Sequence, residues 1–155
     1  MLALMKALTQ ALAALDRGAT SNSHLVPTLL RLGLGAVFLA HAYAKLAVFT
    51  LPGTALFFEA NGLPGWTVYP VLAIELLGGL CFVAGAYVRL AALALLPVMA
   101  GALVPHASNG WMFSNPGGGW EYVAVLILAL IVQFLLGKDA PPSKREDPDA
   151  TSGRV

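Results

Sequence analysis

Four long apolar stretches, separated by short polar or glycine-rich segments, dominate the chain. They run from about Val26 to Phe49, Trp66 to Val88, Arg89 to Pro105 and Glu121 to Leu136. The first two are long enough to cross the hydrocarbon core of a bilayer as helices. The last two, at 1.5 Å per residue, give roughly 25 Å each, which suits a thin bilayer or an untilted helix. The pattern predicts an all-α fold, an integral membrane four-helix bundle.

The segments between these spans differ in character. Between the first two spans, Pro52 and Gly62 bracket an apolar run, which predicts a brief re-entrant or interfacial helix. Between the last two, the stretch HASNGWMFSNPGGGW is rich in Gly, Asn and Ser, which is typical of a loop. Residues 23–137 are therefore expected to form one four-span membrane domain.

The two ends of the chain have a different composition. In residues 1–22, Leu4, Leu8, Ala11 and Leu15 recur at helical spacing, which predicts an amphipathic interfacial helix and a linker. A cleaved secretory signal is the alternative, so retention of this helix stays open. Residues 138–155 are proline-rich and of mixed charge, and we expect a disordered tail.

Composition places the chain in lipid. It is 58% hydrophobic and 11% charged, and its mean hydropathy is +0.76, which exceeds what a soluble domain of 155 residues can bury. The net charge of +1 gives no signal for a nucleic-acid partner. The single cysteine, Cys81, rules out an intramolecular disulfide, a CxxC redox pair and a cysteine-rich metal site.

The positions of the basic residues predict the orientation. With four spans, eight of the nine Lys and Arg side chains lie on the side that holds both termini, and only Lys45 lies on the other. The eight are Lys6, Arg17, Arg31, Arg89, Lys138, Lys144, Arg145 and Arg154. Basic residues favour the cytoplasmic side, so both termini are expected there. The tryptophans Trp66, Trp111 and Trp120 would then mark the outer interface.

One carboxylate, Glu75, interrupts the second span. It lies about 13 Å along the helix from Trp66, near the middle of the membrane. The same helical face continues through the small residues Gly78 and Gly79, which allow a neighbouring helix to approach closely. Because a carboxylate facing lipid is strongly destabilising, this face is expected to point into the bundle.

The first span carries three basic side chains on one face, namely Arg31, His41 and Lys45. Lys45 or His41 would meet Glu75 from the outer side, and Arg31 would approach it from the cytoplasmic side. Two readings of this candidate intramembrane polar cluster stay open. It is either a structural ion pair that fixes helix register or a site that handles protons or a ligand.

A second set of polar groups is expected on the outer side. Its members are His106, Asn109, Trp111 and Glu121. Glu121 also suits the first turn of a helix, where it complements the dipole, and His106 alone is typical of an interfacial histidine. The chain's histidines and carboxylates are too dispersed to form a recognisable metal-ligand motif, so no metal site is predicted.

Taken together, the stretches LRLGLGAVFLAHAYAKL, ANGLP, IELLGGLCFVAG, PHASNGW and GGGWEYVAVL resemble, in order and spacing, the DoxX family of small four-helix bacterial membrane proteins. The resemblance covers about residues 28–137. Family positions carry over to Arg31, Lys45, Gly62, Pro64, Glu75, Gly78, Gly79, Arg89, His106, Gly110, Gly118, Gly119 and Glu121. The chain departs from the family at Ala42, where members often have glycine before the lysine that ends span one, which bears on the size of a pocket facing Glu75.

The resemblance implies a multi-pass protein of the bacterial inner (plasma) membrane that is linked to oxidoreductases and quinones. Because the sequence has no motif for haem, flavin or iron–sulfur binding, electron transfer would need a soluble oxidoreductase or another redox-complex subunit as partner. The first hypothesis is a quinone-binding subunit of such a system, whether or not it is itself catalytic. The alternatives are a non-enzymatic membrane anchor and a small proton-coupled dimeric transporter, and a homo-oligomer is possible.

Overall fold

The computed structural model describes residue 1, residues 4–10 and residues 25–137, and all regular structure in this part of the chain is helical. The elements are α2 (Leu25–Tyr43), η1 (Ala44–Val48), α3 (Leu51–Ala60), η2 (Gly65–Thr67), α4 (Val68–Ala84), α5 (Val88–Leu103), η3 (Val104–Asn109) and α6 (Glu121–Leu136). Residues 4–10 are also helical. The rest of the predicted interfacial segment and the predicted tail lie outside the described residues. The prediction of an all-α fold is confirmed.

Three helical segments are long and apolar enough to cross a membrane. They are Leu25–Val48, Gly65–Ala84 and Val88–Asn109. The fourth predicted span is α6, an apolar helix of 16 residues that is shorter than these. The protein is therefore a helical membrane protein, whereas a fourth crossing and the side on which the termini lie stay predictions.

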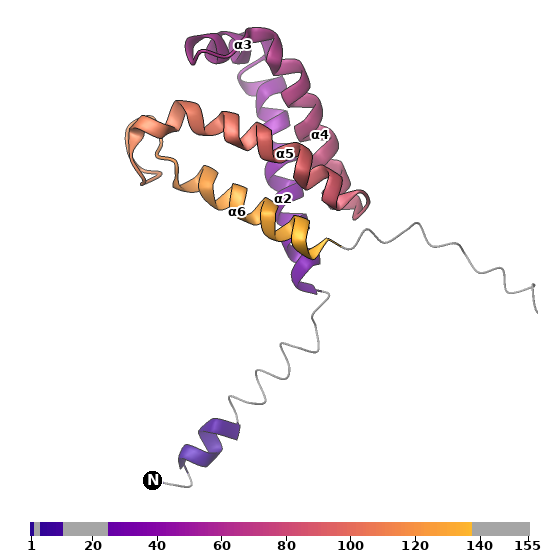
Figure 1. Cartoon of the computed structure of the whole chain (residues 1–155), viewed down its shortest axis with the longest axis vertical. Coiled ribbons are helices and arrows are strands. Elements are labelled where there is room, and N and C mark those ends of the chain that lie inside the picture. Colours follow the sequence, from indigo (N-terminus) through magenta and orange to yellow (C-terminus); the bar gives the residue numbers. More distant parts are fainter. Residues whose placement is uncertain (2–3, 11–24, 138–155) are drawn as a thin grey trace, which may run out of the picture.

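The long helices associate as two antiparallel pairs. Helix α2 packs mainly against α4, and α5 packs mainly against α6. Contacts between α4 and α5, and fewer between α2 and α6, join the pairs into a ring. Figure 1 shows the α5–α6 pair running obliquely to the α2–α4 pair, with α3 across the end where α2 stops and α4 starts. Residues of α3 and of the C-terminal half of α5 line a cavity in this part of the protein.

Proline and glycine set several helix ends. Pro52 occupies the first turn of α3, where its missing N–H costs nothing. Gly85 ends α4 with a φ of 71°, a left-handed conformation that glycine adopts without steric cost. Pro97 lies inside α5, where it removes one backbone hydrogen bond, yet the helix continues to Leu103.

The core lies where the two pairs meet. The rings of Phe38 on α2 and Phe82 on α4 are 6.4 Å apart and fully buried. Gly78 and Gly79 leave room for neighbours on both sides, because Leu95 of α5 fills the space beside Gly78 and Leu39 of α2 fills the space beside Gly79. The small face of α4 thus lets this helix contact α2 and α5 at once.

Candidate functional site

An ion pair joins α4 to the end of the first span. The Nζ atom of Lys45 lies 2.8 Å from Oε1 of Glu75, and it donates a hydrogen bond to that oxygen. The Lys45 side chain is 14% exposed and that of Glu75 is 5% exposed. Both charges are therefore largely buried. A buried charge is costly unless an opposite charge pairs with it, so each side chain stabilises the other.

The helix that carries Lys45 is locally widened. Residues Ala44–Val48 form a π-helix that continues α2, and Lys45 is its second residue. Such short π segments within α-helices are frequent at functional sites because they re-aim side chains. Hydrophobic periodicity carries no signal for this change, so the sequence did not reveal it.

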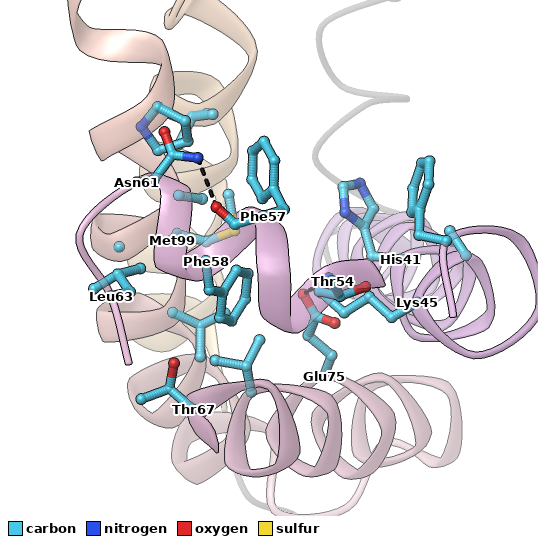
Figure 2. Close-up of a pocket in the computed structure, with 18 of the residues that line it drawn as sticks. His41, Lys45, Thr54, Phe57, Phe58, Asn61, Leu63, Thr67, Glu75 and Met99 are labelled. Carbon is cyan, nitrogen blue, oxygen red and sulfur yellow. Dashed lines mark hydrogen bonds and ion pairs between the residues drawn. The ribbon is translucent and has the colours of Figure 1, made fainter. Parts of the chain in front are cut away.

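The second carboxylate oxygen of Glu75 has no hydrogen-bond partner among the described residues. Oε2 is buried and accepts no hydrogen bond from any residue that the structure describes. Figure 2 shows Thr54 of α3 close to Lys45 and Glu75. The Thr54 hydroxyl is not available to Oε2, since it donates to the carbonyl oxygen of Thr50 at 2.9 Å.

A cavity of about 640 Å³ opens beside the ion pair. Its walls come from α2, η1, α3, η2, α4, α5, η3 and α6, and they are mostly apolar. The aromatic lining residues are Phe49, Phe57, Phe58 and Tyr122. The polar ones are His41, Lys45, Thr54, Asn61, Thr67, Glu75 and His106. Figure 2 shows Phe57 and Phe58 of α3 facing the same space as Met99 of α5. This volume and this lining are typical of small-molecule sites.

Most of the predicted intramembrane residues meet at this cavity, but Arg31 does not. His41, Lys45 and Glu75 all line it. The guanidinium of Arg31 instead lies against Gly85 at the opposite end of α4, ten residues and about 15 Å of helix from Glu75. Its Nε atom is buried without a hydrogen-bond partner among the described residues.

The predicted outer-side residues mainly hold the loop together. His106 and Asn109 contact the carbonyl oxygens of Gly117 and Gly118 at 2.9–3.2 Å. His106 also lines the cavity, which makes it the one outer-side residue of the predicted set in the site.

The other predicted outer-side positions and the loop glycines do not line the cavity. Trp111 packs edge-on against Trp120, with centroids 4.4 Å apart. Glu121 lies in the first turn of α6, as its interaction with the helix dipole would favour. Gly118 has a φ of 73°, and a Cβ at Gly119 would overlap carbonyl oxygens of residues 110–112.

Several lining residues were not predicted as members of the site. Thr54 and Asn61 come from α3, and Tyr122 comes from α6, where its ring stacks on His41 with centroids 6.5 Å apart. The sequence shows that α3 is apolar, but it gives no signal that α3 faces α5. Within the described residues, no three His, Cys, Asp or Glu side chains are grouped as a metal site would require.

The fold and the site define a helical membrane protein with a mostly apolar cavity whose wall includes a buried ion pair. A model of the DoxX family matches residues 26–107, which is more than half of the chain. The chain is 33% identical, over 109 residues, to "Putative oxidoreductase CatD" of Bacillus subtilis (strain 168), and the match covers 70% of this chain and 77% of that protein. No solved structure matches it. The chain belongs to the DoxX family, as its sequence motifs predict.

Proposed function

We propose that this protein is an integral membrane subunit of a quinone-linked redox or quinone-detoxification system, and that its cavity binds a quinone-type ring beside Lys45 and Glu75. The observation that carries the proposal is the position of a buried ion pair in the wall of a cavity whose lining is mostly apolar and includes several aromatic rings. A quinone-type ring would pack its apolar faces against this lining and place a ring oxygen near Lys45. Membership of the DoxX family and the oxidoreductase name of its relative support a redox role.

The residues present suit both parts of such a ligand. Phe57, Phe58 and Met99 supply apolar and aromatic surface for the ring. Lys45 has three N–H donors, of which one is used on Glu75, so another is available for a ligand oxygen. A quinone takes up protons as well as electrons when it is reduced, and Glu75 is placed to hold a proton next to the ring.

This role requires a partner. The sequence carries no haem, flavin or iron–sulfur motif, and a helical bundle without a redox centre does not transfer electrons alone. We therefore place the protein in the bacterial inner membrane, with both termini in the cytoplasm and a soluble oxidoreductase or another redox subunit beside it. The distribution of Lys and Arg supports this orientation.

Ligand binding tests the proposal directly. The purified protein in detergent would be titrated calorimetrically with decylubiquinone, a short-chain quinone, and we expect saturable binding. Lys45→Met removes the donor and should weaken binding about tenfold, the loss of about 1.4 kcal/mol expected for a hydrogen bond from a charged group. Arg89→Gln is the matched control, because Arg89 is an exposed cation at the start of α5 and does not line the cavity.

Two results would overturn the proposal. One is the absence of quinone binding by wild-type protein shown to be folded. The other is unchanged binding in a folded Lys45→Met/Glu75→Leu double variant. Mass spectrometry of what co-purifies with wild type and with this double variant then identifies the anchor alternative: a protein retained equally by both, with no quinone in either, marks a scaffold.

A further inference from the structure

The guanidinium of Arg31 forms no hydrogen bond with any residue that the structure describes. Its Nε atom is buried without an acceptor, and the residue as a whole is half-buried. A guanidinium carries five N–H donors in a planar fork, and buried donors without acceptors are costly. An acceptor from outside the chain would therefore stabilise Arg31 in this position.

The backbone at the end of α4 holds this guanidinium in place. It lies directly against Gly85, where only a residue without a Cβ atom leaves room for it. A cation at the C-terminal end of a helix also complements the helix dipole, which is a purely structural role for Arg31. That role needs no hydrogen bond, so it leaves the donors of the guanidinium available to a ligand.

This end of the bundle, where α4 ends and α5 starts, carries positive charge that no described carboxylate balances. Glu59 belongs to α3 and Glu121 starts α6, so both lie toward the opposite end of the helices. Glu75 lies about 15 Å of helix away from the end of α4. Arg89, in the first turn of α5, adds a second cation. The surplus of positive charge attracts anions to this end.

The depth of this end in the bilayer indicates a phospholipid as the source of the anion. The segment Gly65–Ala84 has 20 residues, which give about 30 Å of helix, the thickness of the hydrocarbon core. Gly85 therefore lies where lipid phosphates begin, and the exposed aromatic ring of Tyr87 suits the same interface. Val83 of α4 and Leu90 of α5 are exposed apolar side chains beside this turn, and they offer surface for acyl chains.

We propose that the end of the bundle at Gly85 binds an anionic phospholipid, whose phosphate accepts hydrogen bonds from the guanidinium of Arg31. The guanidinium fork matches two phosphate oxygens at once, and such charge-assisted pairs are stronger than neutral hydrogen bonds. Basic pockets between membrane helices are typical binding sites for anionic lipid head groups. This proposal is independent of the proposed function, because it concerns the end of the helices opposite the cavity.

Native mass spectrometry of the full chain in detergent measures this binding. The protein would be titrated with phosphatidylglycerol, which is anionic, and with phosphatidylcholine of the same acyl chains, whose choline group offsets the phosphate charge. We expect wild-type protein to bind phosphatidylglycerol about tenfold more tightly, as for one charge-assisted hydrogen bond. A parallel calorimetric titration uses glycerol 3-phosphate, which has the phosphate but no acyl chains. It should bind at least about tenfold more weakly than phosphatidylglycerol, because it buries no apolar surface.

Arg31→Gln and Arg89→Gln form a matched pair of variants. Each removes one positive charge at the same end, but Arg89 is exposed and its guanidinium lies over the ring of Phe134, 5.9 Å from the centroid. Arg31→Gln should lower the affinity for phosphatidylglycerol about tenfold and remove the preference over phosphatidylcholine, whereas Arg89→Gln should stay within about twofold of wild type. Arg31→Lys keeps the charge but loses the fork, so we expect a loss of about threefold. Circular dichroism and gel filtration check that each variant is folded.

The comparison of lipids on wild-type protein decides the proposal even if Arg31→Gln does not fold. Equal affinities for phosphatidylglycerol and phosphatidylcholine would overturn it. Equal losses in Arg31→Gln and Arg89→Gln would also overturn it, because they would mark a diffuse attraction to the charged end of the bundle. If glycerol 3-phosphate binds as tightly as phosphatidylglycerol, the site takes a soluble phosphate compound and the assignment to a lipid is wrong. A preference that is lost with Arg31 and kept without Arg89 supports the proposal.

Discussion

Gly85, the left-handed residue that ends α4, lies directly against the guanidinium of Arg31 on α2. A Cβ atom at position 85 would overlap that guanidinium, and the φ of 71° adds strain for any residue with a side chain. The contact joins the ends of two antiparallel helices on the side opposite the cavity. It also explains why Arg31 takes no part in the candidate site.

Replacing Gly85 with alanine is expected to destabilise the protein through both effects. The left-handed conformation alone costs about 1–2 kcal/mol, and the overlap with Arg31 adds to it. Gly62→Ala is the matched control, because Gly62 has a φ of 78° but open space where its Cβ would lie. Free energies of unfolding from SDS titrations in detergent should therefore rank Gly85→Ala below Gly62→Ala. Adding Arg31→Ala to Gly85→Ala should reduce its loss of stability to about that of Gly62→Ala. Equal losses for Gly85→Ala and Gly62→Ala with Arg31 intact would contradict a cost from the overlap.

The buried ion pair gives a prediction that a double-mutant cycle measures. Lys45→Met leaves the Glu75 carboxylate buried without its partner, and Glu75→Leu does the same to the ammonium. Each single change is expected to lower the free energy of unfolding by up to about 3–5 kcal/mol. The double change should cost much less than the sum, because no uncompensated charge remains. Additive losses would show that the two side chains act independently.

The sequence predicted the helices well and the site only in part. Long apolar runs bounded by Pro and Gly gave the positions of the spans, and the small face beside Glu75 indicated that this carboxylate points inward. Helical phase places a residue on a face and at a depth, but it does not say which way a long side chain runs. Arg31 shares a face with Lys45, yet its side chain extends toward the end of the helix, as basic side chains near membrane interfaces do.

The cavity itself was beyond the reach of sequence patterns. It depends on the oblique crossing of the two helix pairs and on α3 facing α5, which are both tertiary contacts between segments distant in sequence (Figure 1). Periodicity within one segment carries no information on such contacts. The π-helix over Ala44–Val48 was also not predicted. Hydrophobic periodicity does not distinguish a π-helix of five residues from a continuation of the α-helix.

Alanine substitutions at the two adjacent glycines of α4, Gly78 and Gly79, are expected to differ in how far a second substitution in the contacting leucine restores stability. A Cβ at Gly78 would lie 2.8 Å from Cδ1 of Leu95, which is a side-chain tip. A Cβ at Gly79 would lie 2.8 Å from Cγ of Leu39 and, in addition, 3.2 Å from the backbone nitrogen of that residue. Both alanine variants should lose about 1–3 kcal/mol of stability by overpacking. Leu95→Val should restore much of the loss in Gly78→Ala, because it shortens the offending side chain. Leu39→Val should restore less in Gly79→Ala, because the backbone stays in place.

The control for this pair is Gly33→Ala. No atom lies within 4 Å of a Cβ built at Gly33, which is an exposed residue of α2. Alanine there should leave the free energy of unfolding unchanged or raise it slightly, since it favours the helix by up to about 1 kcal/mol. If Gly33→Ala and Gly78→Ala cost the same, close packing at α4 is not the cause of the loss.

Thr50 holds a backbone conformation that its side chain opposes. Its φ of 62° and ψ of 158° fall in a region that glycine occupies almost exclusively, and the residue is β-branched. The cap it provides offsets only part of this strain, since its Oγ1 accepts from the backbone nitrogen of Gly53 at 3.3 Å. Thr50→Gly should relieve about 1–3 kcal/mol of strain and lose only a few tenths with the cap, so the variant is expected to be more stable than wild type. Thr50→Ala loses the cap and keeps most of the strain, so it should be less stable. Thermal unfolding of the three proteins in one detergent gives this ranking, and a Thr50→Gly variant that melts below Thr50→Ala would show that the junction between η1 and α3 is not strained.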